Sequence, residues 1–350
     1  MDGSLVVRAC ARAGLPWEDA LIVSAHELRR AVNACRAHPK VAVLTAPGAG
    51  PAELARALFP QTPRTFVVCE DLDGPDERVV RVRPAEATTR PWNAPQVVLV
   101  LDERRSPDVP GWTARPPGPD GWALDGFDGA ALAPETRAFV LARLGPRTGD
   151  LVWDLGSGDG SVAAECARFG AAAVAVGPDA ASCERIRAAV RARRVRVAVA
   201  RGALPSVLDH LPDPDAVFLA DAEPAAVGAC APRALDRFVA TADERRAPEI
   251  VDALADAGFT ARAATFAVTP LAPPRALGSL ASGSRAADSQ ATDSQVAGSQ
   301  GLGSQASDSG AADSGAQYPP VTIVWARRSA PEPVRPAPPA GRPVERTPPL

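Results

Sequence analysis

The chain has 350 residues, of which 23% are charged, and a formal net charge of -3. This balance supplies no basic field for nucleic acid or an anionic membrane surface, so a small-molecule ligand is expected. No stretch approaches the roughly 20 apolar residues of a membrane-spanning helix, and the amino terminus lacks a secretion-signal pattern. A cytoplasmic protein that binds neither nucleic acid nor membrane is expected.

The first region, residues 1–102, alternates helical and strand patterns and predicts an α/β unit whose core is too small to be comfortably stable alone. Its expected helices cover residues 6–13, 27–37 and 52–58, and its expected strands cover 20–23, 41–44, 65–69 and 96–101. Residues 103–126 are rich in proline and glycine, which disfavour helix and strand alike. They are predicted to be a linker between two domains.

The second region begins near residue 127 and again alternates strands with helices, which predicts a mostly parallel sheet covered on both faces. Its expected helices cover 134–144, 161–169, 180–191, 205–210 and 249–257; its expected strands cover 151–155, 172–176, 195–199, 216–219, a segment around Phe238, and 260–268. A last strand over 318–328 is expected to pair with the strand ending near Val268.

The segment before that last strand has a different character. Residues 276–315 form pentads with serine at each fourth position, and this composition cannot bury enough apolar surface to order itself. A disordered insertion over 276–317 is therefore predicted. The Pro-rich residues 329–350 are predicted to be a disordered tail.

The six cysteines lie far apart, without a C-x-x-C pair and without histidines at ligand spacing. They are interpreted as reduced and mostly buried thiols. No metal site is expected.

The segment VWDLGSGDGSVAAE, residues 152–165, is a strand that runs into Gly156, Gly158 and Gly160 and then into a helix. Glycines permit a tight turn that leaves backbone bare for a ligand, and the helix start offers unpaired N–H groups. A nucleotide-like ligand fits this pattern, although the dinucleotide fingerprint has its third glycine one position later. A strand-helix turn without a ligand is the alternative.

The pattern D-x-G-x-G-x-G after a strand resembles the first motif of doubly wound S-adenosylmethionine-dependent methyltransferases. Together GPRTGDLVWDLGSGDGSVAAECAR, LPDPDAVFLAD and PPVTIVWARR resemble the decarboxylating T half of the precorrin-6B (precorrin-6Y) C5,15-methyltransferases of cobalamin biosynthesis. The segments ARAGLPWEDALIVSAHELR, HPKVAVLTAPGAGPAELARAL and VCEDLDGPDERVVR resemble the second lobe of the family's E half, a tetrapyrrole methylase domain. The two matches follow the family's order.

The resemblance implies an α/β fold: a doubly wound class I S-adenosylmethionine methyltransferase domain, residues 127–328, preceded by a partial tetrapyrrole methylase lobe, residues 1–102. It implies methylation of C15 and decarboxylation of the ring C acetate of a precorrin-6B-type corrinoid. Met1 begins at the family's second E-type lobe and the S-x-H-G-R motif is altered around His26. Methylation of C5 by this chain is therefore not expected, and a separately encoded first lobe and a homo-oligomer are expected as possible partners.

The family motif also implies which residues contact the cofactor, S-adenosyl-L-methionine. In the loop these are Asp154, Gly156, Ser157, Gly158, Asp159 and Gly160. At the end of the second strand the family has an acid for the ribose, but this chain has Gly177, so Asp179 is either a substitute or a helix N-cap. Gly202 and Ala203 stand where backbone approaches the adenine. No catalytic residue is assigned.

Other positions depart from the family. The Thr-Lys pair before the helix at 134–144 is absent, and only Glu135 and Arg137 remain. Asp221 and Glu223 follow the fourth strand in place of a glycine pair, and would repel a carboxylate-rich substrate unless protonated or paired with arginine.

The basic run 187–196 is interpreted as a solvated helix face, with attraction of a polycarboxylate corrinoid as the alternative. Two other functions stay open. One is a noncatalytic or degenerate subunit that supports a separately encoded methyltransferase, and the other is methylation of some other small molecule.

Overall fold

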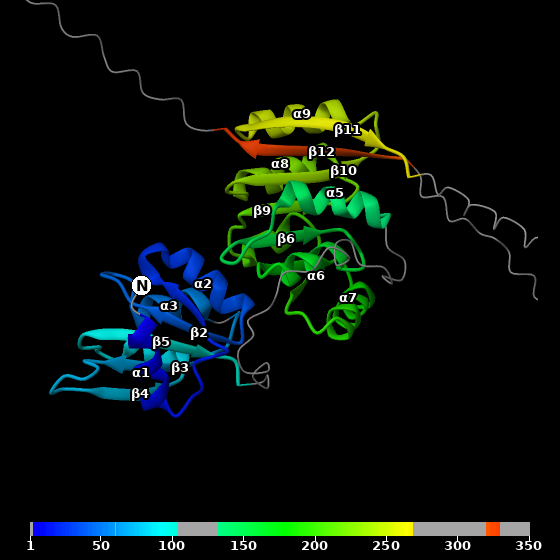
Figure 1. Ribbon diagram of the computed structural model, residues 1–350. Helices are drawn as coiled ribbons and strands as arrows, with labels where there is room; N and C mark the ends of the chain where they lie inside the picture. Colours follow the sequence, from blue (N-terminus) through cyan, green and yellow to red (C-terminus); the bar gives the residue numbers. More distant parts are fainter. Residues whose placement is uncertain (1–2, 60, 104–131, 269–319, 330–350) are drawn as a thin grey trace, which may run out of the picture.

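The computed structural model describes residues 3–59, 61–103, 132–268 and 320–329, which form two α/β domains (Figure 1). Apart from Glu103 and Ser329 at their borders, the predicted linker, serine-rich insertion and proline-rich tail lie outside the described residues. Within the described residues, no helix is long and apolar enough to span a membrane.

The first domain is built on a five-stranded mixed sheet in the order β1-β2-β5-β3-β4. The strands are β1 (Leu21–Ser24), β2 (Lys40–Leu44), β3 (Thr65–Glu70), β4 (Arg78–Val82) and β5 (Pro95–Leu101). The helices are α1 (Gly3–Ala13), α2 (Leu28–Ala37), α3 (Pro51–Leu58) and α4 (Pro84–Thr89), with a 3-10 turn η1 (Ala25–Glu27). Only β1 and β2 are parallel; β5 is antiparallel to both β2 and β3, and β3 is antiparallel to β4.

Both faces of this sheet carry a core. Helix α1 contributes Val6 and Cys10 to one face, whereas α2, α3 and α4 cover the other with residues such as Val32 and Leu54. The strand β4 and the helix α4 were not expected from the sequence. The strand β4 reads RVVRV at the sheet edge and buries only Val82, and α4 is six residues long, so neither carries a strong apolar period.

The second domain is built on a seven-stranded sheet in the order β11-β12-β10-β9-β6-β7-β8. The strands are β6 (Leu151–Leu155), β7 (Ala172–Gly177), β8 (Ala198–Arg201), β9 (Ala216–Leu219), β10 (Arg237–Ala242), β11 (Phe259–Phe266) and β12 (Val321–Arg328). The helices are α5 (Pro134–Leu144), α6 (Ser161–Arg168), α7 (Ala180–Ala192), α8 (Pro224–Cys230) and α9 (Ala247–Asp256), with 3-10 turns η3 (Ser206–His210) and η4 (Ala231–Arg233).

The topology is doubly wound, as expected. Five parallel strands run outward from the central β6 in both directions, through β7 and β8 on one side and through β9 and β10 on the other. The last strand, β12, lies between β10 and β11 and is antiparallel to both. This arrangement confirms the class I methyltransferase type of fold, and the predicted pairing of the last strand with the one ending near Val268 is also confirmed.

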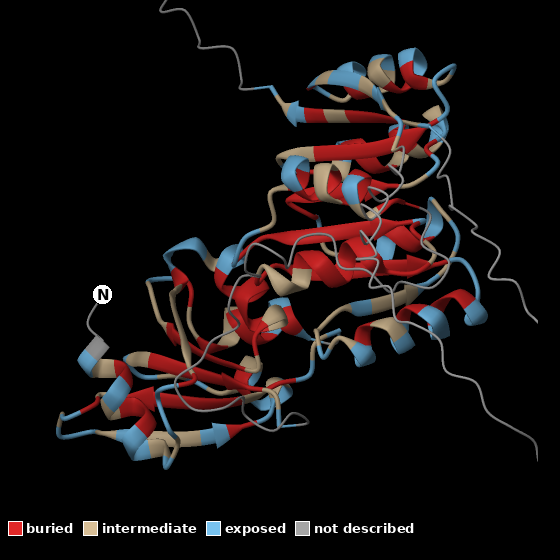
Figure 2. Cartoon of the chain, turned by 45° about the vertical axis from the view of Figure 1, so that its right-hand side comes forward, coloured by how far each residue is buried: buried red, intermediate tan, exposed pale blue. Residues whose placement is uncertain are grey.

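Helices cover both faces of the second sheet. On one face α5 and α6 pack on Val152, Phe218 and Ile323, and α7 packs on Ala173. On the other face η3, α8 and α9 cover a core that includes Trp153. The alternation of Val152 and Trp153 between the two faces is the period expected of a strand covered on both sides. Figure 2 shows the central strands and α6 as buried.

Two expected elements differ from the structure. The strand predicted at 195–199 is β8, Ala198–Arg201, because Arg194 has a left-handed φ of 54° that delays the extended segment. The helix predicted at 205–210 is a 3-10 turn, and α8 was missed because its Pro-Ala-Gly composition has little apolar period.

The two domains are joined at Asp215, a residue that is 5% exposed and precedes β9. Its Oδ2 and Oδ1 accept hydrogen bonds of 2.6 and 2.5 Å from Nη1 and Nη2 of Arg29, which lies on α2. The same carboxylate accepts a 2.7 Å bond from the amide of Leu151 at the start of β6. Asn33, also on α2, donates to the carbonyl of Gly149 at 3.2 Å. One carboxylate therefore ties α2 to the first residue of the central strand.

Replacing Asp215 by alanine removes the bidentate pair and also leaves the Leu151 amide without its partner. We expect the free energy of unfolding to fall by about 3 kcal/mol, and the Leu151 amide to exchange faster, as measured by urea titration and hydrogen exchange. The control is Arg56→Ala, which removes an exposed ion pair with Glu53 and should cost less than about 1 kcal/mol. Equal costs for the two variants would contradict the role assigned to Asp215.

Candidate functional site

The glycine loop between β6 and α6 is the centre of the candidate site. Gly156, Gly158 and Gly160 have φ values of 85°, 76° and 69°, in the left-handed region that favours glycine. A Cβ added to Gly160 would lie 2.7 Å from Cγ2 of Ile186, whereas one added to Gly158 would meet nothing within 4 Å. The loop is packed against the protein at Gly160 and leaves open space at Gly158.

Three side chains brace this loop from within. Oδ2 of Asp154 accepts a 2.8 Å hydrogen bond from the amide of Ala163, and Oδ1 of Asp159 accepts one of 2.9 Å from Ser161. Oγ of Ser157 accepts a 3.1 Å bond from Gly160. The side chains of Asp154, Ser157 and Asp159 thus brace the turn at the carboxyl end of the central strand, which is where doubly wound folds place ligands.

Two buried carboxylate oxygens in the loop have no well-formed hydrogen bond within the described residues: Oδ1 of Asp154 and Oδ2 of Asp159. Their residues are 1% and 6% exposed. Buried oxygens of this kind usually find a donor, so the loop has unused capacity to accept hydrogen bonds from a ligand.

Burial raises the pKa of Asp154 to about 7, although the amide of Ala163 and the neighbouring Ser157 act to lower it. A carboxyl group in this range changes charge near neutral pH.

The helix that follows the loop is fixed by a buried ion pair. Glu165 on α6 is fully buried, and its Oε1 lies 3.6 Å from Nε of Arg137 on α5, which is 1% exposed. Its other oxygen lies 3.4 Å from Arg168. Arg137, one of the two residues retained from the family's first helix, therefore holds α5 against the helix that begins at the glycine loop.

The end of β7, where the sequence resemblance predicts an acid for a ribose, cannot carry a side chain in this conformation. A Cβ on Gly177 would lie 2.8 Å from Sγ of Cys183. Asp179 acts as the N-cap of α7, and its Oδ1 accepts a 2.7 Å bond from Ser182, which lowers its pKa. The cap interpretation is confirmed, and its role toward a ribose stays a prediction.

The segment after β8 lies beside the end of β7, because the amide of Gly202 donates to the carbonyl of Gly177 at 3.1 Å. A Cβ at Gly202 would lie 2.9 Å from Val207, so glycine is required there by packing within the protein. Ala203 is exposed. Both residues are placed at the same edge as the loop, and their contact with an adenine stays a prediction.

The two carboxylates after β9 are paired with an arginine. Arg246 lies 3.5 Å from Asp221 and 2.7 Å from Glu223. Asp221 has a φ of 45°, and its amide donates to the hydroxyl of Thr241 at 3.1 Å. The sequence left two ways in which these carboxylates could avoid repelling an anionic substrate, protonation or pairing with arginine. The structure shows the pairing with arginine.

Cys183, Thr241 and Arg246 contact this edge of the sheet but were not predicted from the sequence as parts of the site. Arg246 could have been found, because it follows β10 and the carboxyl ends of parallel strands share one edge. The contact of Cys183 with Gly177 has no sequence signal. All six cysteines are buried and free. The described residues contain no cluster of three or more potential metal ligands.

Comparison with known proteins agrees with the sequence resemblance. Residues 127–242 match a family model described as a precorrin methyltransferase domain. A decarboxylating precorrin-6Y C(5,15)-methyltransferase of a Sinorhizobium species is 34% identical over 232 residues, which cover 62% of this chain and 53% of that protein. One of Mycobacterium tuberculosis is 30% identical over 234 residues, covering 62% and 54%. The chain thus spans about half the length of the curated relatives it matches.

Among solved structures, the precorrin-6Y C5,15-methyltransferase of Geobacter metallireducens is similar to this chain with 21% identity and a TM-score of 0.42. The match covers 58% of this chain and 94% of that one. The resemblance to the decarboxylating precorrin-6Y C5,15-methyltransferases, first drawn from the motifs, is confirmed by the sequence relatives and by the family model.

The raised pKa of Asp154 predicts a pH-dependent stability. Between the unfolded pKa of about 3.9 and the folded pKa of about 7 the native state holds a proton that the unfolded chain has lost. The free energy of unfolding should therefore fall as pH rises through this window, by on the order of 4 kcal/mol from this group. Urea titrations from pH 4 to pH 8 measure it.

In Asp154→Asn, which can still accept the bond from Ala163, the part of this slope due to Asp154 should disappear. Asp252→Asn on the exposed face of α9 is the control and should leave the slope unchanged. If Asp154→Asn leaves the pH dependence of the free energy of unfolding unchanged, the carboxyl group of Asp154 is not protonated in the folded protein over this pH range.

The loop glycines should differ in their tolerance of alanine. Gly158→Ala meets open space and should cost only the strain of a left-handed φ, about 1 kcal/mol. Gly160→Ala adds the collision with Ile186, so its total should reach about 3 kcal/mol. Thermal and urea unfolding of the two variants side by side measure the difference, and a Gly158 variant as costly as the Gly160 one would rule out the open space at Gly158.

Proposed function

We propose that the second domain is an S-adenosyl-L-methionine-dependent C-methyltransferase of corrin ring biosynthesis, which methylates C15 and decarboxylates the ring C acetate of a precorrin-6B-type substrate. The observation that carries the proposal is the glycine loop, which combines open space at Gly158 with buried oxygens on Asp154 and Asp159 that have no well-formed hydrogen bond within the described residues. The loop lies inside the segment that matches the precorrin methyltransferase family model. The sequence relatives are decarboxylating precorrin-6Y C(5,15)-methyltransferases, and the resemblance of the motifs to that family supports the assignment of C15 and of the ring C acetate.

The residues present fit the cofactor at the loop. The bare backbone at Gly156 and Gly158 allows a close approach, and the buried carboxylate of Asp154 offers an acceptor for a cationic amino group. Gly202 and Ala203 would line the adenine side. We further infer that Asp179 can reach the ribose only if its cap bond to Ser182 is exchanged for one to the ligand.

When bound, the cofactor supplies an electrophilic methyl group. The chain's own contribution is to hold the loop rigid, through the bonds from Ala163, Ser161 and Gly160, so that donor and acceptor carbon meet in one orientation. The buried pair of Arg137 and Glu165 keeps α6 in place behind the loop. Arg246, already engaged with Asp221 and Glu223, reduces their repulsion toward a carboxylated substrate.

For the first domain we infer an E-type tetrapyrrole methylase lobe, on the strength of its three sequence segments. Its role in this chain is then to dock through α2 on the methyltransferase domain. As part of the same proposal, we infer that the chain binds a separately encoded first E-type lobe and forms a homo-oligomer.

A specific observation favours a second candidate, a noncatalytic subunit that supports a methyltransferase encoded elsewhere. At Gly177 the place of a side chain is taken by Cys183, so the ribose acid of the family has no counterpart there. The nearest carboxylate, Asp179, is committed to a helix cap. A chain that had stopped binding the cofactor would tolerate both changes.

Calorimetric titration with S-adenosyl-L-methionine separates the two candidates. We expect micromolar binding by the native chain, at least tenfold weaker binding by Gly158→Arg, and unchanged binding by Gly228→Arg. The control fits because a Cβ on Gly228, which is exposed on α8, also meets nothing within 4 Å. Circular dichroism melts check that both variants are folded.

Binding by the native chain leads to the second step, in which mass spectrometry of a precorrin-6B-type substrate should record a gained methyl group and a lost carboxylate. A folded native chain that fails to bind the cofactor would reject the methyltransferase and leave the supporting subunit as the function.

A further inference from the structure

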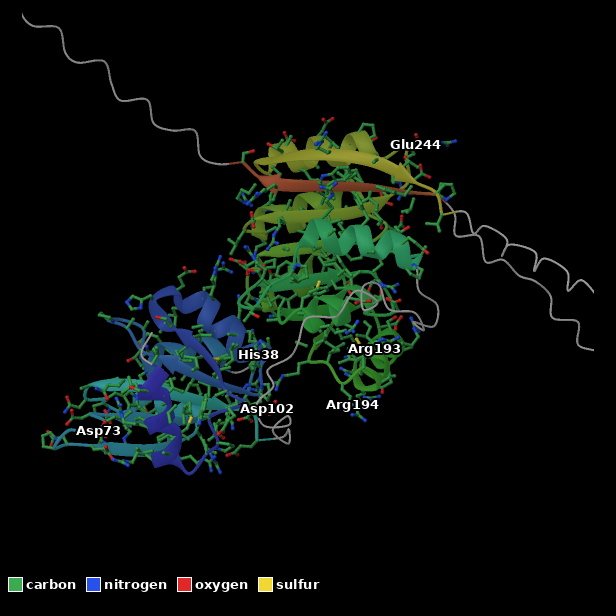
Figure 3. All side chains as sticks on the ribbon, in the orientation of Figure 1. His38, Asp73, Asp102, Arg193, Arg194 and Glu244 are labelled. Atoms are coloured by element: carbon green, nitrogen blue, oxygen red, sulfur yellow. The ribbon has the colours of Figure 1, made fainter. Side chains whose placement is uncertain are left out.

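The two outer strands of the second sheet carry different side chains on their two faces. Strand β11 lies at the edge of the sheet and, among the described strands, pairs with β12 alone. Helix α9 covers one face through Ile250 and Leu254, which share a core with Val324 of β12. On the other face, α5 packs on β9 and β10 and contacts the outer strands through Phe139. Figure 3 labels Glu244, three residues before α9, at this outer end of the domain.

The face on the α5 side combines three half-buried aromatic rings with two exposed arginines. The ring centroids of Phe266 and Trp325 lie 4.4 and 5.3 Å from that of Phe139. Arg143 of α5 stacks on Phe139 and on Trp325, at 4.6 Å from each centroid. Arg262 stands directly across from Trp325 in the ladder between β11 and β12, so both side chains are on one face of the sheet. We call these five residues the aromatic-arginine face.

The two arginines of this face have no anionic partner among the described residues. Neither Arg143 nor Arg262 forms an ion pair or a side-chain hydrogen bond with a described residue. The nearby Arg327, by contrast, is paired with Asp236 at 3.4 Å. A guanidinium that stacks on a ring keeps the N–H groups at its rim free to donate. The face therefore offers apolar area together with two charges that are open to carboxylates.

The outer surface of α9 has the opposite charge. Glu249, Asp252 and Asp256 are exposed and follow one another at spacings of three and four residues, which places them on one side of the helix over about 10 Å. None of the three forms an ion pair or a side-chain hydrogen bond with a described residue. Helix α9 contains no lysine or arginine, and the exposed residues next to the acids, Pro248 and Ala255, are small and uncharged. We call the three acids the acidic face.

The aromatic-arginine face and the acidic face lie on opposite sides of the same pair of strands. A second copy of the chain that is stacked on the first without being turned over therefore brings its acidic face onto the aromatic-arginine face of the first. Pairing either face with itself would instead oppose like charges, which is costly. Charge and position together match a second copy joined front to back.

We propose that the aromatic-arginine face of one copy binds the acidic face of a second copy, with Arg143 and Arg262 paired to carboxylates of α9 and Trp325 packed between them. The contact is heterologous, so each copy keeps one face open for a further copy. Two strands of eight residues cover roughly 26 Å by about 10 Å. This area is at the low end of specific interfaces, so association in the micromolar range is expected. That a homo-oligomer forms rests on the proposed function, whereas the faces and their charges do not depend on it.

Sedimentation velocity of the full chain over a range of micromolar concentrations tests the contact. The mean mass of the native chain should rise with concentration, and less so at high salt. Arg262→Glu and Asp252→Arg each reverse one charge, on different faces, and each should weaken association at least tenfold. The matched control is Arg83→Glu, which should leave association unchanged. Arg83 is an exposed arginine of the first domain that has no ion pair with a described residue.

A mixture of the two charge-reversal variants tests the front-to-back geometry. Arg262→Glu retains the acidic face, and Asp252→Arg retains the aromatic-arginine face, so an equimolar mixture should associate again although each variant alone stays monomeric. The two reversed charges also attract each other across the second contact. Circular dichroism melts check that both variants are folded.

The outcomes separate this contact from the proposed methyltransferase. Binding of S-adenosyl-L-methionine by Arg262→Glu should equal that of the native chain, because neither face includes the glycine loop. A native chain that stays monomeric at every concentration, association that either variant leaves unchanged, or a mixture that stays monomeric would overturn the contact. Failure of cofactor binding alone would reject the methyltransferase and leave the contact intact.

Discussion

The carboxylate of Asp215 is the interaction on which the arrangement of the molecule depends. It is nearly buried, and it joins the guanidinium of Arg29 on one domain to the backbone of Leu151 on the other. Leu151 begins β6, the central strand, and β6 ends at the glycine loop. The position of the first domain is therefore set from the amino end of the same strand whose carboxyl end carries the candidate cofactor site. A charge placed this way is stabilising only while both partners are present, because an unpaired buried carboxylate is costly.

Much of the second domain could be predicted from its sequence because its signals are local. Leu151–Leu155 is a buried strand that is apolar at every position except Asp154, and the three glycines after it fix a tight turn. The start of β8 could not be predicted, because the left-handed turn at Arg194 is occupied by a residue with no preference for it. The weakly apolar β4, α4 and α8 were not predicted either, because their stability comes from packing against the rest of the fold and not from a local sequence pattern.

In the candidate site, too, contacts between residues close in the chain could be predicted, and contacts between separate elements could not. The bracing of the loop by Asp154, Ser157 and Asp159 follows from positions close together in the chain. By contrast, the contact of Cys183 with Gly177 and the pairing of Arg246 with Asp221 and Glu223 join separate elements. The contact of Cys183 has no sequence pattern, whereas the rule that parallel strands end at one edge could have placed Arg246 near the two carboxylates. Both contacts bear directly on whether the site recognises a ribose and an anionic substrate.

The position of β12 has a consequence for how the sheet is assembled. Strand β11 ends at Phe266, and among the described strands it pairs with β12 alone, which starts at Val321 and lies between β11 and β10. On a ribosome, β11 emerges well before the strand that attaches it, and until then β10 has an open edge. The closing step must bring together residues far apart in the chain, at an entropic cost that grows only slowly with their separation. One edge of the domain is therefore completed last, after the glycine loop, its helix and the central strands have all been synthesised.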